Sequence, residues 1–237
     1  MDSFSAWMPL ISLIFGGILL VAALGAVLYW LLVITEGVYL GSWAVVLGYD
    51  IVARRYDDIK EFTLDDEQIL VVDPLLGELG DVRRPLVLDV ATGTGRVPYF
   101  LFEDGRFDGH VIGLEPSHKM LAIAQEKLEP HQGGVSLLRQ SAVPLPFPDQ
   151  TFDAVTCLEA VEFFPDQEEA LREMSRVLKP GGVLITTRRI GWESKMFFGR
   201  SYTREQFEMF LLKIGFTEAF SFHWETIYDL VIARKLR

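Results

Sequence analysis

Two glycines and two carboxylates near the middle of this sequence have the spacing of a ligand-binding loop. The stretch "VLDVATGTG", residues 87–95, places Gly93 and Gly95 in a tight turn just after an apolar run that contains Asp89. Glycines permit positive φ and let a ligand approach the backbone, and the N-terminus of a following helix attracts anionic groups. Glu115 lies 20 residues after Gly95, where a carboxylate binds ribose hydroxyls. These residues predict a site for a ribose-containing cofactor.

Two cofactors suit this arrangement. A dinucleotide fold requires a third glycine in the pattern G-x-G-x-x-G, and Pro98 stands at that position. Pro98 therefore argues against a nicotinamide-dependent oxidoreductase, which stays as an alternative. S-adenosylmethionine has no pyrophosphate and needs no third glycine, and Asp89 would supply negative charge near its ammonium group.

The elements that must position these residues follow from hydrophobic patterning. Seven segments are expected as strands: 86–91, 110–115, 135–140, 151–159, 181–189, 216–224 and 227–235. Helical patterns separate most of them, with Ser117 as one expected N-cap and Thr203 to Gln206 as a capping box. This alternation predicts a mainly parallel sheet covered on both faces. The short turn between the last two strands predicts that they pair antiparallel.

The first part of the chain has a different character. Ser3 to Thr35 are 33 residues without a charge, longer than the ~20 apolar residues that cross a bilayer as a helix. We expect a single membrane span. Arg54, Arg55 and Lys60 follow it, so the positive-inside rule places the folded domain in the cytoplasm. The uncharged stretch 37–49 is short for a second span. It could continue the first helix, lie at the membrane interface or pack on the domain, and we favour a helix at or near the membrane surface.

Composition excludes several classes. The chain carries 22 Lys and Arg against 33 Asp and Glu, a net charge of -11, so nucleic acid is not expected as a partner. The single cysteine, Cys157, rules out an intrachain disulfide and is expected to be an inert core thiol. No metal-ligand spacing is present among the four histidines.

From about Tyr56 to its end the sequence resembles class I S-adenosylmethionine-dependent methyltransferases, and most of all the ubiquinone/menaquinone-biosynthesis type. The resemblance rests on four segments in order: "VLDVATGTG" (87–95), "GLEPSHKML" (113–121), "LPFPDQTFDAV" (145–155) and "EMSRVLKPGGVLI" (173–185). It implies an α/β fold, a doubly wound, Rossmann-like seven-stranded sheet with the last strand antiparallel, here preceded by a transmembrane helix. The expected division is an anchor (1–36), interfacial or linker helices (37–80) and a methyltransferase domain (81–237).

The resemblance also implies a cofactor site. It assigns these residues to the binding of S-adenosylmethionine: Tyr56, Asp89, Ala91, Thr92, Gly93, Gly95, Glu115, Pro116, Met120, Ser141, Ala142 and Glu159. Ser141 departs from the family, which has an acidic residue there beside the adenine amine. A neutral hydroxyl accepts a weaker hydrogen bond than a carboxylate does.

The methyl acceptor and the base are less constrained. Glu159, Tyr202 and His223 are the candidate catalytic residues. An anchored domain suggests an acceptor that resides in the bilayer, such as a quinone precursor or a lipid. The segment 188–202 mixes basic and aromatic residues, which is typical either of a lid or membrane contact or of packing at the sheet edge. The absence of an obvious base leaves a second hypothesis, a membrane-tethered cofactor-binding scaffold without catalysis. Oligomeric state stays open.

Overall fold

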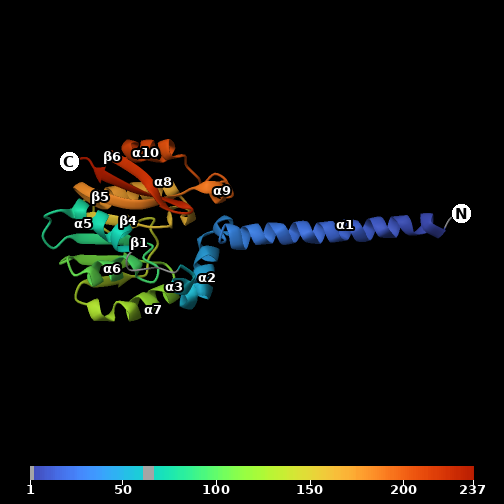
Figure 1. The fold of residues 1–237 in the computed structure, drawn as a ribbon, viewed down its shortest axis with the longest axis horizontal. Coiled ribbons are helices and arrows are strands. Elements are labelled where there is room, and N and C mark those ends of the chain that lie inside the picture. The colour runs from blue at the N-terminus through green and yellow to red at the C-terminus, as the bar shows by residue number, and fades with distance from the viewer. Residues whose placement is uncertain (1–2, 61–66) are drawn as a thin grey trace.

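A seven-stranded sheet forms the centre of the protein, with the strand order β3-β2-β1-β4-β5-β7-β6 (Figure 1). The computed structural model describes residues 3–60 and 67–237. The strands are β1 Leu86–Val90, β2 His110–Leu114, β3 Val135–Leu138, β4 Phe152–Cys157, β5 Leu178–Arg189, β6 Phe216–Glu225 and β7 Tyr228–Lys235. Each of the seven predicted strands is present.

The direction of the strands agrees with the prediction. The pairs β1–β2, β1–β4, β2–β3 and β4–β5 are parallel, whereas β7 runs antiparallel to both β5 and β6. The chain adds β2 and β3 on one side of β1 and then returns to place β4 on the other side. Such a switch point opens a crevice at the carboxyl ends of the strands, where ligands bind in α/β sheets.

Helices cover both faces of the sheet. The described helices are α1 Ser3–Tyr29, α2 Ser42–Val52, α3 Tyr56–Lys60, α5 Asp73–Leu79, α6 Arg96–Asp104, α7 His118–Lys127, α8 Gln167–Val177, α9 Gly191–Ser194 and α10 Arg204–Lys213. The Ser117 hydroxyl accepts from the Met120 N–H and caps α7, and Thr203 and Gln206 form a capping box at α10. Both caps confirm the sequence prediction.

Two apolar clusters fill the space between helices and sheet. Leu171 of α8 and Phe207 of α10 pack on one face, and Leu101 of α6 packs on the other. The second cluster also contains Val72 and Leu75, whose side chains are fully buried. The sequence predicts linker or interfacial helices for residues 37–80. The helix α5 within that range packs against β4 and β5, which is why Leu75 belongs to the core of the domain.

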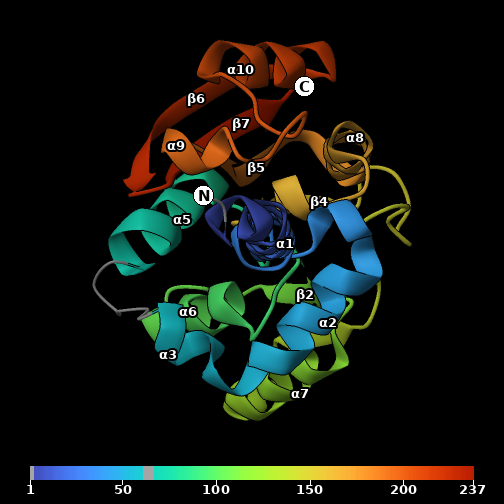
Figure 2. The same ribbon diagram turned by 90° about the vertical axis from the view of Figure 1, so that its right-hand side faces the viewer.

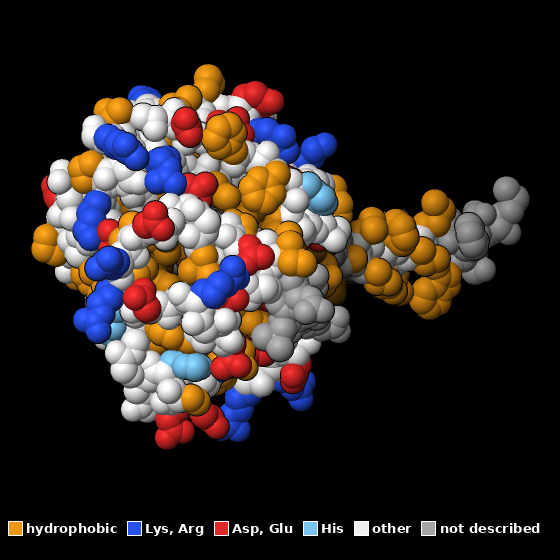
Figure 3. Space-filling view, turned by 60° about the vertical axis from the view of Figure 1, so that its left-hand side comes forward, with side chains coloured by type: hydrophobic (Ala, Val, Ile, Leu, Met, Phe, Trp, Pro, Cys, Tyr) orange, Lys and Arg blue, Asp and Glu red, His pale blue; other side chains and the backbone are white. Residues whose placement is uncertain are grey.

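The helix α1 and the π-helical turn Trp30–Ile34 project away from the domain (Figure 1). Trp7–Ile34 is long and apolar enough to cross a membrane by length and composition, and its most apolar window is not buried by the rest of the protein. Figure 3 shows hydrophobic side chains covering this helix, while charged side chains are spread over the domain. An apolar surface of this extent requires a cover other than water.

The chain turns sharply between α1 and α2. Gly37 and Gly41 have φ of +79° and +100°, and the short helical turn Val38–Leu40 lies between them. The helix α2 then lies beside the base of α1 and packs at the carboxyl end of the sheet (Figures 1 and 2). The stretch 37–49 therefore contains the helical structure that its sequence predicts.

Candidate functional site

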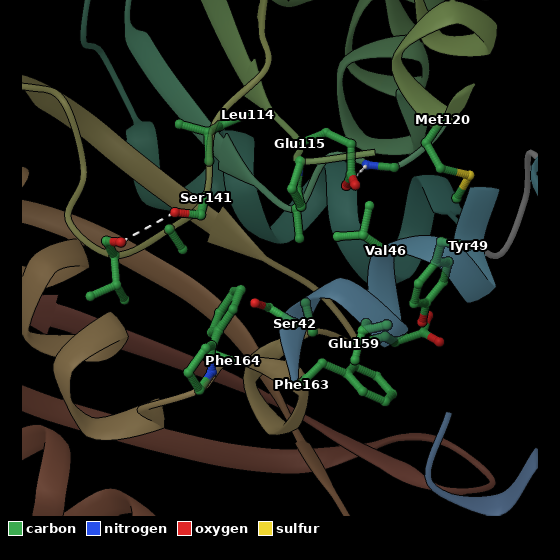
Figure 4. Close-up of a pocket in the computed structure, with 18 of the residues that line it drawn as sticks. Ser42, Val46, Tyr49, Leu114, Glu115, Met120, Ser141, Glu159, Phe163 and Phe164 are labelled. Atoms are coloured by element: carbon green, nitrogen blue, oxygen red, sulfur yellow. Dashed lines mark hydrogen bonds between the residues drawn. The ribbon is translucent and has the colours of Figure 1, made fainter. Parts of the chain in front are cut away.

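A cavity of about 540 Å³ lies between the carboxyl ends of β1, β2 and β4 and the helix α2 (Figure 4). This volume falls in the range of small-molecule sites, ~300–1,000 Å³. Its walls come from five segments: residues 42–49 with Tyr56, residues 91–93, residues 114–120, residues 139–143, and residues 158–165. The switch point in strand order thus provides the site that the fold predicts.

The glycine turn forms one end of the cavity. Ala91, Gly93 and Gly95 all have positive φ, at +58°, +57° and +81°. Ala91 and Gly93 line the cavity, whereas Gly95 does not. A Cβ atom on Gly95 would lie 2.7 Å from Leu128 Cδ1. The sequence predicts that Gly95 lines the cofactor site. In the structure Gly95 instead packs against α7, where a larger residue would clash with Leu128.

Glu115 stands at the end of β2 with its carboxylate fixed by the backbone. One oxygen accepts from the Gly93 N–H at 3.2 Å, and the other accepts from the Ser117 N–H at 2.9 Å. Burial raises the pKa of Glu115 to about 7, although both backbone hydrogen bonds favour its charged form. Each carboxylate oxygen retains capacity for one more donor. A pair of neighbouring hydroxyl groups would complete this arrangement.

Asp89 lies deeper in the protein. Its carboxylate oxygens accept from the Thr92 and Thr156 hydroxyls, each at 2.6 Å. Burial raises the pKa of Asp89 to about 6, and the two hydrogen bonds oppose that rise. Asp89 and Thr92 border a small extension of the cavity beside Gly93. Asp89 therefore orders the turn through Thr92 and places negative charge behind it.

Glu159 sits at the end of β4 between two cations. Its carboxylate pairs with Arg96 Nη1 at 2.5 Å and with the ammonium group of Lys60. Burial alone would raise the pKa of Glu159, but the charges of Lys60 and Arg96 outweigh it and the pKa is lowered. Arg96 also holds Glu67 through two nitrogens. These ion pairs join the segment before β1 to the glycine turn, and they make Glu159 a weak base.

The remaining predicted cofactor residues surround the side of the cavity next to α7. Pro116, Met120, Ser141 and Ala142 all line it, together with Leu114. The Ser141 hydroxyl donates to the Val143 carbonyl at 3.2 Å, as Figure 4 shows. Tyr56 lines the cavity as well, and burial raises its pKa well above the usual range. The cavity wall here is apolar and suits a flat ring.

Two of the proposed catalytic residues lie elsewhere. Tyr202 packs on Phe207 with ring centroids 5.6 Å apart and borders a separate, small pocket. The His223 side chain is 68% exposed on β6, 3.8 Å from Asp229. Neither residue lines the cavity, so neither is positioned to act as a base there. Strand β6 is at the far edge of the sheet, and only the tertiary order β5-β7-β6 reveals that distance.

Sequence patterns missed the wall that α2 provides. Ser42, Val46 and Tyr49 face the cavity opposite Glu115 and Met120 (Figure 4), and Val45 also lines it. The Tyr49 hydroxyl donates to a Glu36 carboxylate oxygen at 2.9 Å, which ties α2 to the end of α1. The uncharged character of residues 37–49 was the available signal. It predicts an apolar environment but does not say that part of this environment is a cavity.

Comparison with known proteins agrees with this geometry. The sequence profile described as "Methyltransferase domain" matches residues 88–186, the region that carries β1, β2, β4, the glycine turn and Glu115. Residues 88–186, fewer than half of the 237, thus resemble a methyltransferase domain. The cofactor implied by this domain is S-adenosylmethionine.

Curated relatives extend the comparison over the same region. A demethylmenaquinone methyltransferase of Listeria welshimeri is 44% identical over 99 residues, which are 41% of this chain and 42% of that protein. The enzyme of the same name from Thermus thermophilus is 46% identical over 100 residues, 42% of this chain and 44% of its own. The match thus spans less than half of each relative.

Solved structures share the fold more widely. A SAM-dependent methyltransferase from Aquifex aeolicus has a TM-score of 0.59 at 21% identity, covering 75% of this chain and 96% of its own. The cyclase SpnF has a TM-score of 0.67 at 20% identity, covering 82% of this chain and 97% of its own. At this identity the likeness establishes the fold and leaves the chemistry to the site.

The residues present fit the cofactor. Each carboxylate oxygen of Glu115 accepts one backbone hydrogen bond and can accept another from a ribose hydroxyl. Gly93 leaves space beside these oxygens, and Met120 provides an apolar surface for the adenine ring. The extension beside Asp89 offers negative charge for an ammonium group. Among the described residues, no group of histidine, cysteine and carboxylate side chains could hold a metal ion.

Proposed function

We propose that this protein is a membrane-anchored methyltransferase that uses S-adenosylmethionine to methylate a lipophilic acceptor of the quinone-precursor or lipid type. The observation that carries the proposal is the composition of the cavity. One wall presents Glu115 and the glycine turn, and the opposite wall is the apolar face of α2. That helix is connected by a few residues to a helix long enough to span a bilayer.

In this proposal one wall binds the cofactor and the other binds the acceptor. When bound, S-adenosylmethionine supplies an electrophilic methyl group on its sulfonium. Glu115 would hold the ribose, and the glycine turn would hold the amino-acid end. Val46, Tyr49 and Phe163 would then confine the acceptor opposite the cofactor, excluding water from the reacting atoms. Such positioning contributes up to ~7–11 kcal/mol to the lowering of a barrier.

Arg54 and Arg55 support an orientation in which the domain is cytoplasmic, since they are the first basic residues after the apolar helix. The relatives described above are demethylmenaquinone methyltransferases, so a quinone-type acceptor is the first compound to test. The charges of Arg96 and Lys60 lower the pKa of Glu159, so this carboxylate is a weak base. The acceptor must therefore carry an acidic hydroxyl or carbon of its own.

The experiment uses the full chain in lipid nanodiscs with methyl-labelled S-adenosylmethionine. We expect label to enter the lipid fraction when a demethylated quinol or a membrane lipid extract is added, and to stay in the aqueous phase with the Gly93→Val variant. Release of S-adenosylhomocysteine with no labelled lipid would contradict a lipophilic acceptor.

A second function is favoured by one observation. Of the two described carboxylates that line the cavity, Glu159 is a weak base and Glu115 is assigned to the cofactor. A tethered cofactor-binding scaffold would bind S-adenosylhomocysteine as tightly as an enzyme does. It would transfer no label to any acceptor, either in nanodiscs or with a soluble quinol. Binding without transfer across both acceptor classes would replace the methyltransferase proposal with this one.

A further inference from the structure

The two faces of α2 meet different surroundings. One face lines the cavity through Val45, Val46 and Tyr49. The other carries Trp43, Leu47 and Ile51, spaced by four residues, with exposed fractions of 66%, 51% and 73%. Residues four apart lie on one side of a helix. A helix on the surface of a water-soluble protein has polar residues there, so this stripe is adapted to apolar surroundings.

A second exposed apolar group lies in the segment 188–202. Trp192 and Phe198 are each 63% exposed. The segment is anchored beside the end of α1, because the Trp30 Nε1–H donates to the Met196 carbonyl at 3.2 Å. The Tyr39 hydroxyl also donates to the Phe198 carbonyl at 2.9 Å. Between them Phe197 is buried against Val38 and Phe163. Part of the segment therefore packs, and part of it points outward.

These two groups flank α1. In the view along α1 toward the domain, α2 lies on one side of its base and α9 on the other (Figure 2). From the side, both occupy the end of the domain from which α1 leaves (Figure 1). A bilayer crossed by α1 would meet this end of the domain first. Exposed basic residues accompany both groups, Arg54 and Arg55 after α2 and Lys195 after α9, as suits anionic lipid headgroups.

Trp43 connects the stripe to the cavity. Its side chain belongs to the exposed stripe and also lines the cavity beside Ser42. Three further lining residues are exposed, namely Pro165, Arg139 and Ser141. The apolar surface on the outside of α2 is thus continuous with the apolar wall inside. A molecule with a long apolar tail can pass Trp43 without leaving an apolar environment.

We propose that Trp43, Leu47, Ile51, Trp192 and Phe198 form a lipid-contact collar that lies in the headgroup region of the bilayer, and that Trp43 marks the portal through which the acceptor enters from the membrane. The proposal rests on the membrane anchor of the proposed function. It deepens that function, since an acceptor using this portal keeps its tail in the bilayer while its head group occupies the cavity.

The first test measures lipid contact and does not depend on activity. Single cysteines replace Leu47, Ile51 and Phe198 in a full-length Cys157→Ala chain, and each is labelled with an environment-sensitive fluorophore. Leu20→Cys in α1 and Met209→Cys in α10 serve as the membrane and solvent references, since Met209 is 62% exposed on a distant helix. The chains are reconstituted in phosphatidylcholine/phosphatidylglycerol vesicles that contain lipids with a nitroxide at a shallow or a deep position.

An interfacial helix buries its apolar face by about 5–10 Å, so we expect shallow nitroxides to quench the labels at 47, 51 and 198 at least about threefold more than the label at 209. Deep nitroxides should quench the label at 20 most. Quenching at 20 but not at 47, 51 and 198 would overturn the collar and leave the anchor. No quenching at 20 would overturn both, independently of whether the domain transfers methyl groups.

The second test addresses the portal. The double variant Leu47→Gln, Ile51→Gln changes the collar without touching the cavity lining. We expect its turnover with a long-tailed quinol in vesicles to fall about tenfold and its turnover with a short-tailed, soluble quinol to stay as in the unmodified chain. The matched control Met209→Gln, Leu212→Gln should change neither rate. Equal losses with both acceptors would overturn the portal.

Discussion

The cavity has two walls that differ in origin and in chemistry. The sheet wall is built from the carboxyl ends of β1 and β2 and presents backbone N–H groups and the carboxylate of Glu115. The α2 wall is apolar and comes from residues 42–49, which lie outside the matched domain of residues 88–186. The similarity to known methyltransferases therefore covers the wall that would hold the cofactor, whereas the proposed acceptor wall comes largely from the N-terminal part of this chain.

This contrast predicts that variants of the two walls have separable effects. Changes on the sheet side should alter cofactor affinity, and changes on α2 should alter the acceptor alone. The ion pairs between them should affect the stability of the whole assembly. For the full chain in detergent or nanodiscs, we expect the effects to decrease from the ion pairs to the sheet wall and then to α2.

The Arg96→Met variant should destabilise the protein most. It leaves Glu67 and Glu159 buried without their shared cation, and loss of one partner of a buried ion pair costs about 3–5 kcal/mol. We expect the melting temperature to fall by roughly 6–20 °C. The matched control is Arg106→Met, because Arg106 pairs with Asp73 and Asp104 at the surface with 56% of its side chain exposed. Equal melting temperatures for the two variants would contradict the conclusion that Arg96 stabilises the fold by pairing with Glu67 and Glu159.

The Gly93→Val variant should reduce the affinity for S-adenosylhomocysteine by at least about 100-fold, because the side chain would fill the cavity beside Met120 and strain a residue at φ +57°. Calorimetric titration measures this loss. Gly105 has φ of +77°, and a side chain there would meet open space. Gly105→Val therefore carries similar backbone strain and should bind as the unmodified chain does. A loss of affinity in both variants would mean that strain alone explains the result.

The Glu115→Gln variant should weaken S-adenosylhomocysteine binding about 30-fold, since a hydrogen bond to a charged group contributes about 1.5–3 kcal/mol. The amide also places a donor against the N–H of Gly93 or Ser117. The matched control is Glu103→Gln, at a surface carboxylate that is 44% exposed. Acceptor KM should not change in either variant when the cofactor is saturating, and a changed KM would show that the walls are not separable.

Glu115 should also make binding depend on pH. Ribose hydroxyls donate best to the ionised carboxylate, so we expect the affinity for S-adenosylhomocysteine to be about five- to tenfold weaker at about pH 6 than at about pH 8. The stability of the unliganded chain should change in the opposite direction. The pKa of Glu115 is raised on folding to about 7, so its contribution to stability is present at low pH and is lost as the pH rises through 7. Glu115→Gln should flatten both profiles.

Val46→Ala should have the smallest effect and affect the acceptor alone. Removal of two methyl groups from the α2 wall costs about 1 kcal/mol of binding, so we expect acceptor KM to rise about fivefold. The affinity for S-adenosylhomocysteine should stay unchanged by calorimetry. A loss of cofactor affinity of similar size would place Val46 on the cofactor side and contradict the separate roles of the two walls.

The sequence by itself determined the sheet and the cofactor wall. Strands and helix caps follow from local patterns, because a β-strand alternates its side chains and a cap requires a hydroxyl at one position. The turn with Gly93 and the carboxylate Glu115 could be recognised for the same reason, since a short motif fixes their backbone geometry. Their meeting at one edge of the sheet follows from parallel strand order.

Only the tertiary structure decided the rest. His223 is absent from the cavity lining because the strand order β5-β7-β6 carries it to the sheet edge. Tyr202 is absent because it packs on Phe207 beside a separate pocket. Gly95 serves packing because α7 lies against it. Val46 and Tyr49 reach the cavity because the sharp turn at Gly37 and Gly41 folds α2 back over the sheet. Long-range packing sets each of these positions, and an uncharged stretch of sequence has the same pattern whether it meets lipid, a core or a cavity.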